Sequence, residues 1–251
     1  PTVKGLDVVK MFRNSTQYYA IFTDSHGNFL KNKNIQFNIN GVFYTRTTND
    51  KGIAMMNINL NPGKYVITVI NLVTGEQSGN NITVKSLIVQ KDLTKHYLNA
   101  SKFQTTIYNK DGSLAVNKEV TFNINGVFYH RTTDSNGVAS LGISLRPGEY
   151  IITTMFDGLA IGNKVSVLPT LVTKNLNMKY LDGSSFTAQT LNGQGKPLAN
   201  QNVSFNVNGV FYYKVTDNNG MAKLNIRLMP GEYIITSCWN NFQTGNTIRI
   251  F

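Results

Sequence analysis

Polar and apolar residues alternate with a period of two along much of this chain. In its middle third, Val120, Phe122 and Ile124 are separated by polar residues. The same alternation returns further on, at Ala139, Leu141, Ile143 and Leu145. A period of two is typical of β-strands with one buried face, and no segment has the apolar period of 3.6 residues that a helix shows. The pattern therefore predicts an all-β protein.

Turn residues divide these alternating runs into short strands. Asn125-Gly126 strongly indicates a two-residue hairpin, because both residue types tolerate a positive φ. Further turns are expected at Asp134 to Gly137 and at Pro147-Gly148. The strands expected between these turns include 102–108, 127–133, 150–154 and 161–167. Several short strands separated by regular turns favour a Greek-key β-sandwich.

The whole pattern occurs three times. The run Asn-Gly-Val-Phe-Tyr lies at 40–44, 125–129 and 208–212, and Pro-Gly-x-Tyr lies at 62–65, 147–150 and 230–233. Both motifs recur with spacings of 85 and 83 residues. Such regular recurrence predicts structural modules in series. The predicted domains are residues 1–84, 85–167 and 168–251, each an immunoglobulin-like Greek-key β-sandwich of about seven strands.

The tyrosine after each Pro-Gly opens a late strand and is predicted to form a tyrosine corner, with its hydroxyl bound to nearby backbone. These residues are Tyr65, Tyr150 and Tyr233.

The three motifs together resemble a known group of repeats. Asn-Gly-Val-Phe-Tyr is followed by Thr-Asp-x-x-Gly-x-Ala at 133–139 and 216–222, and then by Pro-Gly-x-Tyr. This order resembles the bacterial-type immunoglobulin-like repeats of large surface proteins, above all those of adhesin-like proteins of methanogenic archaea. The first copy departs from it, with Asn49 in place of the Asp. The resemblance covers essentially the whole chain and implies an exported, multi-repeat protein of the cell surface.

A reaction carried by the module should use equivalent residues in every copy. The three histidines, His26, His96 and His130, lie at three different module positions, and no Asp or Glu occupies one aligned position in all three copies. No phosphate-binding loop, nucleophile elbow or zinc-protease motif is present. We therefore expect no enzymatic activity, cofactor or metal site, although an enzyme confined to one copy stays an alternative.

Self-crosslinking is a subtler chemistry that surface modules of this type use. A buried lysine amine attacks an asparagine amide, because an apolar site favours the neutral amine. Lys10 aligns with Lys95, and Asn80 aligns with Asn163. The third copy has Met178 at the lysine position, so the crosslink is a minor hypothesis that competes with solvated lysines and hydrogen-bonded asparagines.

The chain is basic, with 24 Lys and Arg against 13 Asp and Glu and a net charge of +11. The excess is spread over all three units, which argues against a specific nucleic-acid site. It favours attraction to anionic surfaces instead. The single cysteine, Cys238, excludes an intrachain disulfide and is expected to fill space in a strand. No apolar run is long enough to span a membrane. The chain begins at Pro1 without a signal peptide, which suggests a fragment of a longer protein.

Two further sets of surface residues are candidates. In an alternating strand the Phe and Tyr of each Val-Phe-Tyr triplet cannot both point inward, so one aromatic per copy should face outward. This possible aromatic row comprises Phe43, Tyr44, Phe128, Tyr129, Phe211 and Tyr212. Four Asn-x-Ser/Thr triplets are possible glycosylation sites, at Asn14, Asn81, Asn99 and Asn202.

The favoured interpretation is a structural or adhesive segment of an extracellular, cell-surface protein. The short junctions between copies predict a semi-rigid rod, whose parent chain is expected to hold further immunoglobulin-like repeats. Expected partners are polymers or proteins of the cell envelope or of a host or neighbouring cell. The alternative is a carbohydrate-binding repeat module appended to a cell-envelope enzyme.

Overall fold

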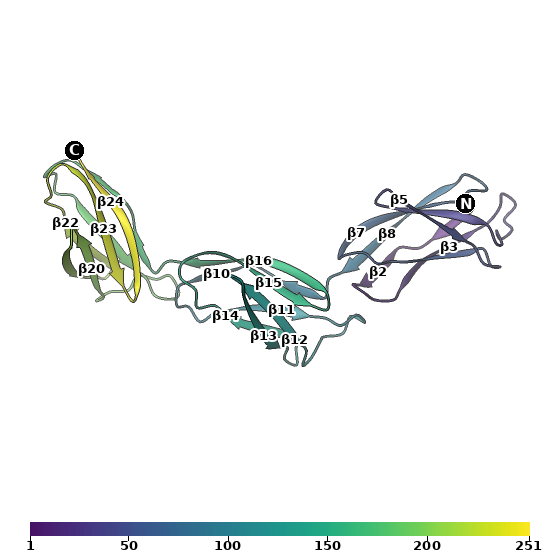
Figure 1. Cartoon of the computed structure of the whole chain (residues 1–251), viewed down its shortest axis with the longest axis horizontal. Helices are drawn as coiled ribbons and strands as arrows, with labels where there is room; N and C mark the ends of the chain where they lie inside the picture. The colour runs from purple at the N-terminus through teal and green to yellow at the C-terminus, as the bar shows by residue number, and fades with distance from the viewer.

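The computed structural model describes all 251 residues and confirms the all-β prediction, with 24 strands and no helix. Three β-sandwich modules follow one another along a bent row, and the two ends of the chain lie at opposite ends of that row (Figure 1). The chain contains no helix that could cross a membrane.

Module 1 contains eight strands. They are β1 (Val3–Gly5), β2 (Val8–Met11), β3 (Gln17–Phe22), β4 (Asn34–Ile39), β5 (Val42–Thr47), β6 (Ile53–Asn57), β7 (Gly63–Ile70) and β8 (Gln77–Lys85). One sheet has the order β1-β3-β6 and the other the order β2-β8-β7-β4-β5. The expected number was about seven, and the eighth arises because the first strand is split. Its first half pairs antiparallel with β3, and its second half crosses over to pair parallel with β8.

Modules 2 and 3 repeat this arrangement. Module 2 contains β9 (Ile88–Gln90), β10 (Leu93–His96), β11 (Lys102–Ile107), β12 (Glu119–Ile124), β13 (Val127–Thr132), β14 (Val138–Gly142), β15 (Gly148–Phe156) and β16 (Leu159–Leu168). Module 3 contains β17 (Leu171–Thr173), β18 (Leu176–Met178), β19 (Ser185–Thr190), β20 (Asn202–Val207), β21 (Val210–Val215), β22 (Met221–Asn225), β23 (Gly231–Trp239) and β24 (Phe242–Ile250). Each sheet is built from strands of one copy only. The exact domain boundaries stay predictions.

The core of each module lies between its two sheets, where the alternating apolar residues meet. Phe122 of the five-stranded sheet is fully buried and meets Phe103 of the smaller sheet edge to face, with ring centroids 6.0 Å apart. The equivalent pairs are Tyr18–Phe37 at 5.6 Å and Phe186–Phe205 at 5.8 Å. Offset and perpendicular aromatic pairs are the favourable arrangements. The same aromatic cross therefore holds the two sheets together in all three modules.

The turns adopt the predicted geometry. Asn40 and Gly41 have φ of 53° and 78°, the two positive values that a type I′ hairpin between β4 and β5 requires. Gly52 also has a positive φ, of 70°, and a Cβ there would in addition lie 2.5 Å from the carbonyl oxygen of Phe22. The tyrosine corners are confirmed, with each hydroxyl donating to the carbonyl four residues earlier. These bonds are Tyr65 to Asn61, Tyr150 to Arg146 and Tyr233 to Met229.

The modules do not share their cores equally. One connected cluster of 31 buried apolar residues extends through modules 1 and 2, and it includes the fully buried Leu87 in the link between β8 and β9. Module 3 has a separate cluster of 13 buried residues. Thr170 takes the place of Leu87 in the second link and is itself buried. The first junction is therefore continuous with the core, and the second is not.

Candidate functional site

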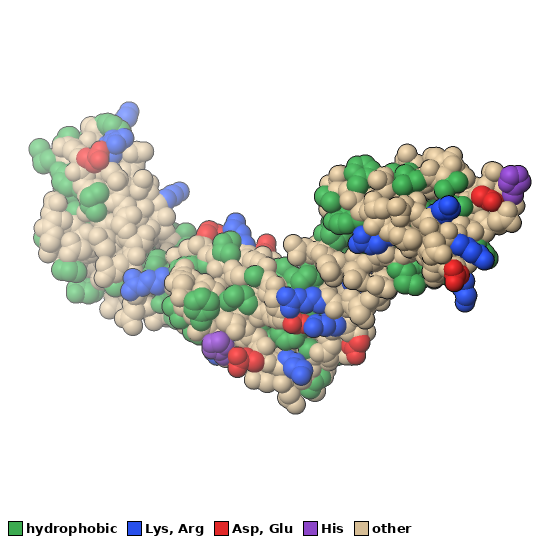
Figure 2. Space-filling model, turned by 45° about the vertical axis from the view of Figure 1, so that its right-hand side comes forward, with side chains coloured by type: hydrophobic (Ala, Val, Ile, Leu, Met, Phe, Trp, Pro, Cys, Tyr) green, Lys and Arg blue, Asp and Glu red, His purple; other side chains and the backbone are tan.

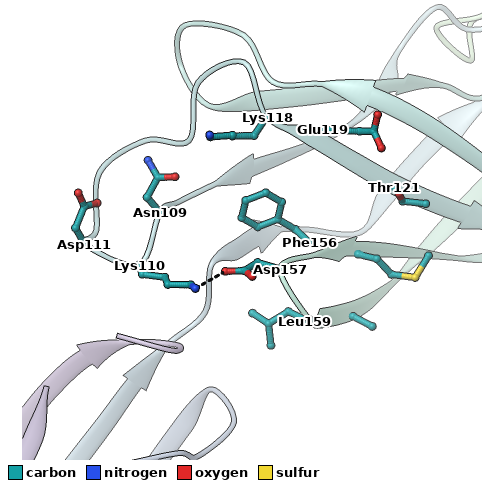
Figure 3. A pocket seen from close by; sticks show the side chains of 12 residues that line it. Asn109, Lys110, Asp111, Lys118, Glu119, Thr121, Phe156, Asp157 and Leu159 are labelled. Carbon is teal, nitrogen blue, oxygen red and sulfur yellow. Dashed lines mark ion pairs between the residues drawn. The ribbon is translucent and has the colours of Figure 1, made fainter. Parts of the chain in front are cut away.

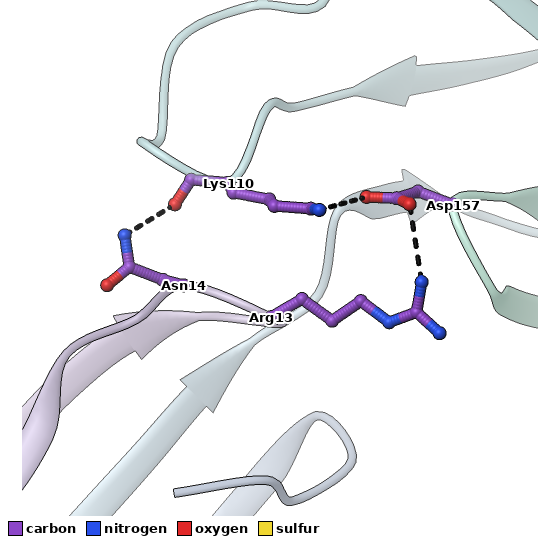
Figure 4. A network of polar contacts seen from close by, with 4 residues as sticks. All are labelled: Arg13, Asn14, Lys110 and Asp157. Carbon is purple, nitrogen blue, oxygen red and sulfur yellow. Dashed lines mark hydrogen bonds and ion pairs between the residues drawn. The ribbon is translucent and has the colours of Figure 1, made fainter. Parts of the chain in front are cut away.

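The first junction contains a network of polar contacts across the two modules (Figure 4). Asp157, in the turn between β15 and β16, accepts from Arg13 at 3.3 Å and pairs with Lys110 at 3.4 Å. The side-chain amide of Asn14 donates to the carbonyl of Lys110 at 2.9 Å. Arg13 and Asn14 belong to the loop after β2, whereas the other two residues belong to module 2. One carboxylate thus links a cation from each module.

The second junction reuses one of these contacts. Asn99, equivalent to Asn14, donates its side-chain amide to the carbonyl of Gly193 at 2.7 Å, and Gly193 is equivalent to Lys110. No ion pair joins modules 2 and 3; instead the rings of Tyr97 and Phe242 lie 6.0 Å apart. The two junctions therefore share an amide-to-carbonyl contact and differ in everything around it.

The loop that makes this contact has a strained backbone. Arg13 and Leu98 occupy equivalent positions and have φ of 59° and 64°, in the left-handed region that bulky residues rarely adopt. Asn14 and Asn99 follow them, and each accepts a hydrogen bond from the backbone two residues further on. This local turn fixes the amide so that it faces the next module.

The sequence singled out Asn14 and Asn99 as glycosylation candidates, and the structure places their amides in the junctions. Sequence reasoning missed this role, although the shared module position of the two triplets was a signal for it. Of the other two candidates, Asn81 donates its side-chain amide to Asp7 at 3.2 Å, and Asn202 is exposed at the start of β20. Glycosylation at all four stays a prediction.

An open groove of about 930 Å³ lies in module 2 beside the first junction (Figure 3). Phe156, Leu159 and Met155 form its apolar part. Its polar rim mixes both charges, at Asn109, Lys110, Asp111, Lys118, Glu119 and Asp157. These groups are spread along the rim rather than directed at one point. Thr121 also lines the groove, and its hydroxyl lies 3.2 Å from Nδ1 of His130.

The two candidate crosslinking lysines are buried but do not contact the candidate asparagines. Lys10 donates from Nζ to the carbonyl of Ile58 at 2.7 Å, and Lys95 donates to the carbonyl of Ile143 at 2.6 Å. Burial lowers the pKa of both amines below its ordinary value of 10.5. Asn163 donates instead to Asp92 at 2.8 Å. The amine and the amide therefore have separate partners in both copies.

These asparagines take part in a clamp that holds the split first strand against β8. Asp7 accepts from the backbone N–H of Asn81 at 2.8 Å and from the side chain of Asn80 at 3.2 Å. The hydrogen bonds from Asn81 and Asn80 lower the pKa of Asp7. In module 3 Asn175 takes this position and accepts from the backbone of Thr247 at 3.0 Å. The carboxylate of Asp7 and the amide of Asn175 can both accept this backbone hydrogen bond, because each supplies an acceptor oxygen.

The side chains that could bind a metal are scattered, and a hydroxyl–imidazole contact joins Thr121 to Nδ1 of His130. No three His, Cys, Asp or Glu side chains lie close enough together to hold a metal ion. His130 pairs with Glu119 at 3.3 Å on the surface of module 2, and Cys238 lies half-buried in β23. Basic and acidic side chains are interspersed on the visible face of the molecule, with no large patch of one sign (Figure 2).

The aromatic candidates lie on the last strand of each five-stranded sheet. Phe43 is 58% exposed and lies opposite Asn38, on the outer face of the sheet. Tyr44 is 38% exposed and lies opposite the buried Phe37, so it covers the edge of the core. The other copies agree, with exposed fractions of 58% for Phe128 and 59% for Phe211. The phenylalanine is therefore the outward aromatic in each copy.

No family model matches this chain, and no curated protein matches it. Among solved structures, it is similar to a three-domain tandem of titin, I9–I11, with 15% identity and a TM-score of 0.37 over 99% of this chain and 98% of that one. It is also similar to a Ca²⁺-stabilized ice-binding adhesin of an Antarctic bacterium, with 15% identity and a TM-score of 0.26 over 100% of this chain and 74% of that one. Invasin, a bacterial integrin-binding protein, is 15% identical with a TM-score of 0.30 over 100% of this chain and 60% of that one.

Proposed function

We propose that this chain is a load-bearing spacer of an extracellular, cell-surface protein of the adhesin type. The observation that supports it most is the pairing of the first and last strands of each module. β2 and β8 run parallel, with Val8 to Met11 in register with Ile82 to Lys85. The equivalent pair in module 2 is β10 with β16, and in module 3 it is β18 with β24.

Parallel pairing of the terminal strands determines how a module responds to tension. Force applied between the two ends of a module pulls β2 and β8 past each other along their length. The hydrogen bonds between them lie across that direction, so they must break together rather than one after another. The clamp from Asp7 to Asn81 lies at the start of the same strand pair and resists the same displacement. Each module is therefore built to resist stretching.

The junctions fit the same role. The N- and C-termini of the chain lie at opposite ends of the row of modules (Figure 1). Each junction is held by a hydrogen bond from an asparagine side-chain amide of one module to a backbone carbonyl of the next. Such a segment would hold a distal part of its parent protein away from the surface. Binding by any partner of the cell envelope or of another cell would come on top of this mechanical function.

Pulling single molecules by their ends tests the proposal. We expect three successive force peaks, each releasing about 280 Å of chain for a unit of roughly 80 residues. Module 3 should give the lowest peak, because β18 and β24 pair over three residues whereas β2 and β8 pair over four. A featureless extension curve would show that the modules bear no load. Labelling of intact cells by an antibody to this chain tests the surface location separately.

A further inference from the structure

The outer face of each five-stranded sheet carries one row of side chains that is the same in all three modules. In module 1 the row crosses four strands, since Phe43 pairs with Asn38, Asn38 with Thr68, and Thr68 with Gly79. In module 2 the row is Phe128, Asn123, Thr153 and Gly162, and in module 3 it is Phe211, Asn206, Thr236 and Gly245. Four adjacent strands span about 14 Å.

Burial does not explain this identity. The three phenylalanines are 58%, 58% and 59% exposed, and the Asn and Thr side chains are half-exposed. Positions next to the row on the same face have diverged: Thr45 of module 1 corresponds to His130 and Tyr213. Exposed positions on a strand tolerate many residue types. A solvent-facing row that stays unchanged while its neighbours vary indicates contact with something outside the module.

The glycine at the end of the row provides a second, independent observation. Gly79, Gly162 and Gly245 lie inside long strands, and none has a positive φ. A Cβ on Gly245 would meet nothing within 4 Å, and on Gly79 it would meet only Val66, at 3.8 Å. The fold therefore does not require glycine here, and glycine weakens a strand. A glycine of this kind often marks a place where a ligand approaches the backbone closely.

The composition of the row indicates the class of ligand. It contains no ionisable side chain in any copy, so it does not select a charged partner, although the whole chain has a net charge of +11. The asparagine amide and the threonine hydroxyl both donate and accept hydrogen bonds. In module 3 the amide oxygen of Asn206 already accepts from the backbone N–H of Gly209 at 3.2 Å. Covering the remaining donors and acceptors with an apolar partner would leave them unpaired at a cost in free energy. A partner with hydroxyl groups and an apolar face that can lie on the Phe ring would match both the polar and the aromatic part of the row.

We propose that each Phe–Asn–Thr–Gly row binds a neutral polysaccharide chain, with a sugar ring on the phenylalanine and sugar hydroxyls on the asparagine and threonine. The edge strands that carry the phenylalanines lie on different sides of the molecule, with β5 on the upper side of module 1 and β13 on the lower side of module 2 in Figure 1. Each row is therefore expected to bind on its own, and the whole segment is expected to bridge neighbouring polymer chains. This inference is independent of the load-bearing role, because a spacer can bear tension without binding sugars.

The test is electrophoresis of the whole chain through gels containing a soluble β-glucan, mannan, galactan or dextran, with hyaluronan as an anionic comparison. We expect at least one neutral polymer to retard the protein and hyaluronan to act only at low salt. Replacing the three row phenylalanines by alanine should weaken that retardation about tenfold or more. Phe29→Ala, which removes a phenylalanine that is 55% exposed outside the rows, should leave it unchanged.

Replacing the row glycines separates a binding role from a structural one. Gly245→Val, Gly162→Val and Gly79→Val together should raise the melting temperature, because strand glycines are replaced by a good strand former, and should abolish retardation. If retardation persists in the phenylalanine or the glycine variants, the row is not the binding site. If no neutral polymer retards the protein, or if the phenylalanine variants instead abolish self-association of the chain, the proposal is wrong. The pulling experiment is unaffected by any of these results.

Discussion

The separate core of module 3 makes Phe205→Ala an informative change. Phe205 is fully buried and lies edge to face with Phe186, at a ring distance of 5.8 Å. Both residues belong to the cluster of 13 buried residues that is confined to module 3. Removing the ring should therefore destabilise module 3 alone.

The expected loss is a large part of the stability of one module. Replacing a buried phenylalanine by alanine costs about 3–5 kcal/mol, from lost burial and from the cavity that remains. A module of roughly 80 residues is expected to be stable by about 4–12 kcal/mol. With an m-value of about 1.5 kcal/mol per molar urea, a loss of about 4 kcal/mol lowers the unfolding midpoint by about 2–3 M.

The only tryptophan of the chain reports on this module. Trp239 lies half-buried in β23, and its indole N–H donates to Gln201 of the same module at 3.3 Å. Urea unfolding followed by tryptophan fluorescence therefore measures module 3, while circular dichroism measures all three modules. Phe122→Ala, the equivalent change in module 2, is the matched control: it should shift the circular dichroism transition and leave the fluorescence midpoint in place.

Two outcomes would refute this reasoning. If Phe122→Ala lowered the fluorescence midpoint as much as Phe205→Ala, modules 2 and 3 would unfold as one unit despite their separate cores. If Phe205→Ala left the fluorescence midpoint unchanged, the aromatic cross would not hold the two sheets together.

Four further changes test individual contacts. Asp157→Asn should lose both ion pairs of the first junction and so broaden the range of angles between modules 1 and 2. Because salt screens exposed ion pairs, small-angle scattering should show a shape that depends on salt for the wild type and not for the variant. Folding lowers the pKa of Asp7, so this carboxylate stabilises the fold fully at a pH above 3.8, its ordinary pKa, and the stabilisation is lost as pH falls through the lower pKa of the folded state. Asp7→Asn should remove this acid sensitivity, measured by amide hydrogen exchange in β2 and β8. Lys95→Met, which copies Met178 of module 3, should cost less than Lys95→Ala in a thermal melt, because methionine fills the same space. The lowered pKa of Lys95 also means that its charged form is disfavoured by folding, so wild-type stability should rise relative to Lys95→Met as pH approaches 10.5. Tyr150→Phe should lose about 1 kcal/mol of module 2 stability by removing one hydroxyl donor, and no loss would mean that the tyrosine corner is dispensable.

The sequence was sufficient to predict the local architecture of each module. The alternation at Val120, Phe122 and Ile124 identified a half-buried strand, because side chains in a strand point to opposite faces in turn. Asn40-Gly41 identified the hairpin that follows, because few other residue pairs accept two positive φ values at low cost. The threefold recurrence of the motifs also predicted the number of modules, since motifs that recur in the same order at one spacing indicate repeated folding units.

Only the tertiary structure decided what depends on contacts between distant residues. The first strand is split between two sheets, and Asp7 at the break binds the backbone of Asn81, a pairing that nothing in the local sequence shows. Asn14 braces a junction because the loop at Lys110 of the next module comes within its reach. The Phe–Asn–Thr–Gly row brings together residues from four strands that are as far apart in the chain as Asn38 and Gly79. A period of two fixes which face a side chain takes, but the order and register of strands in the sheet decide which side chains become neighbours.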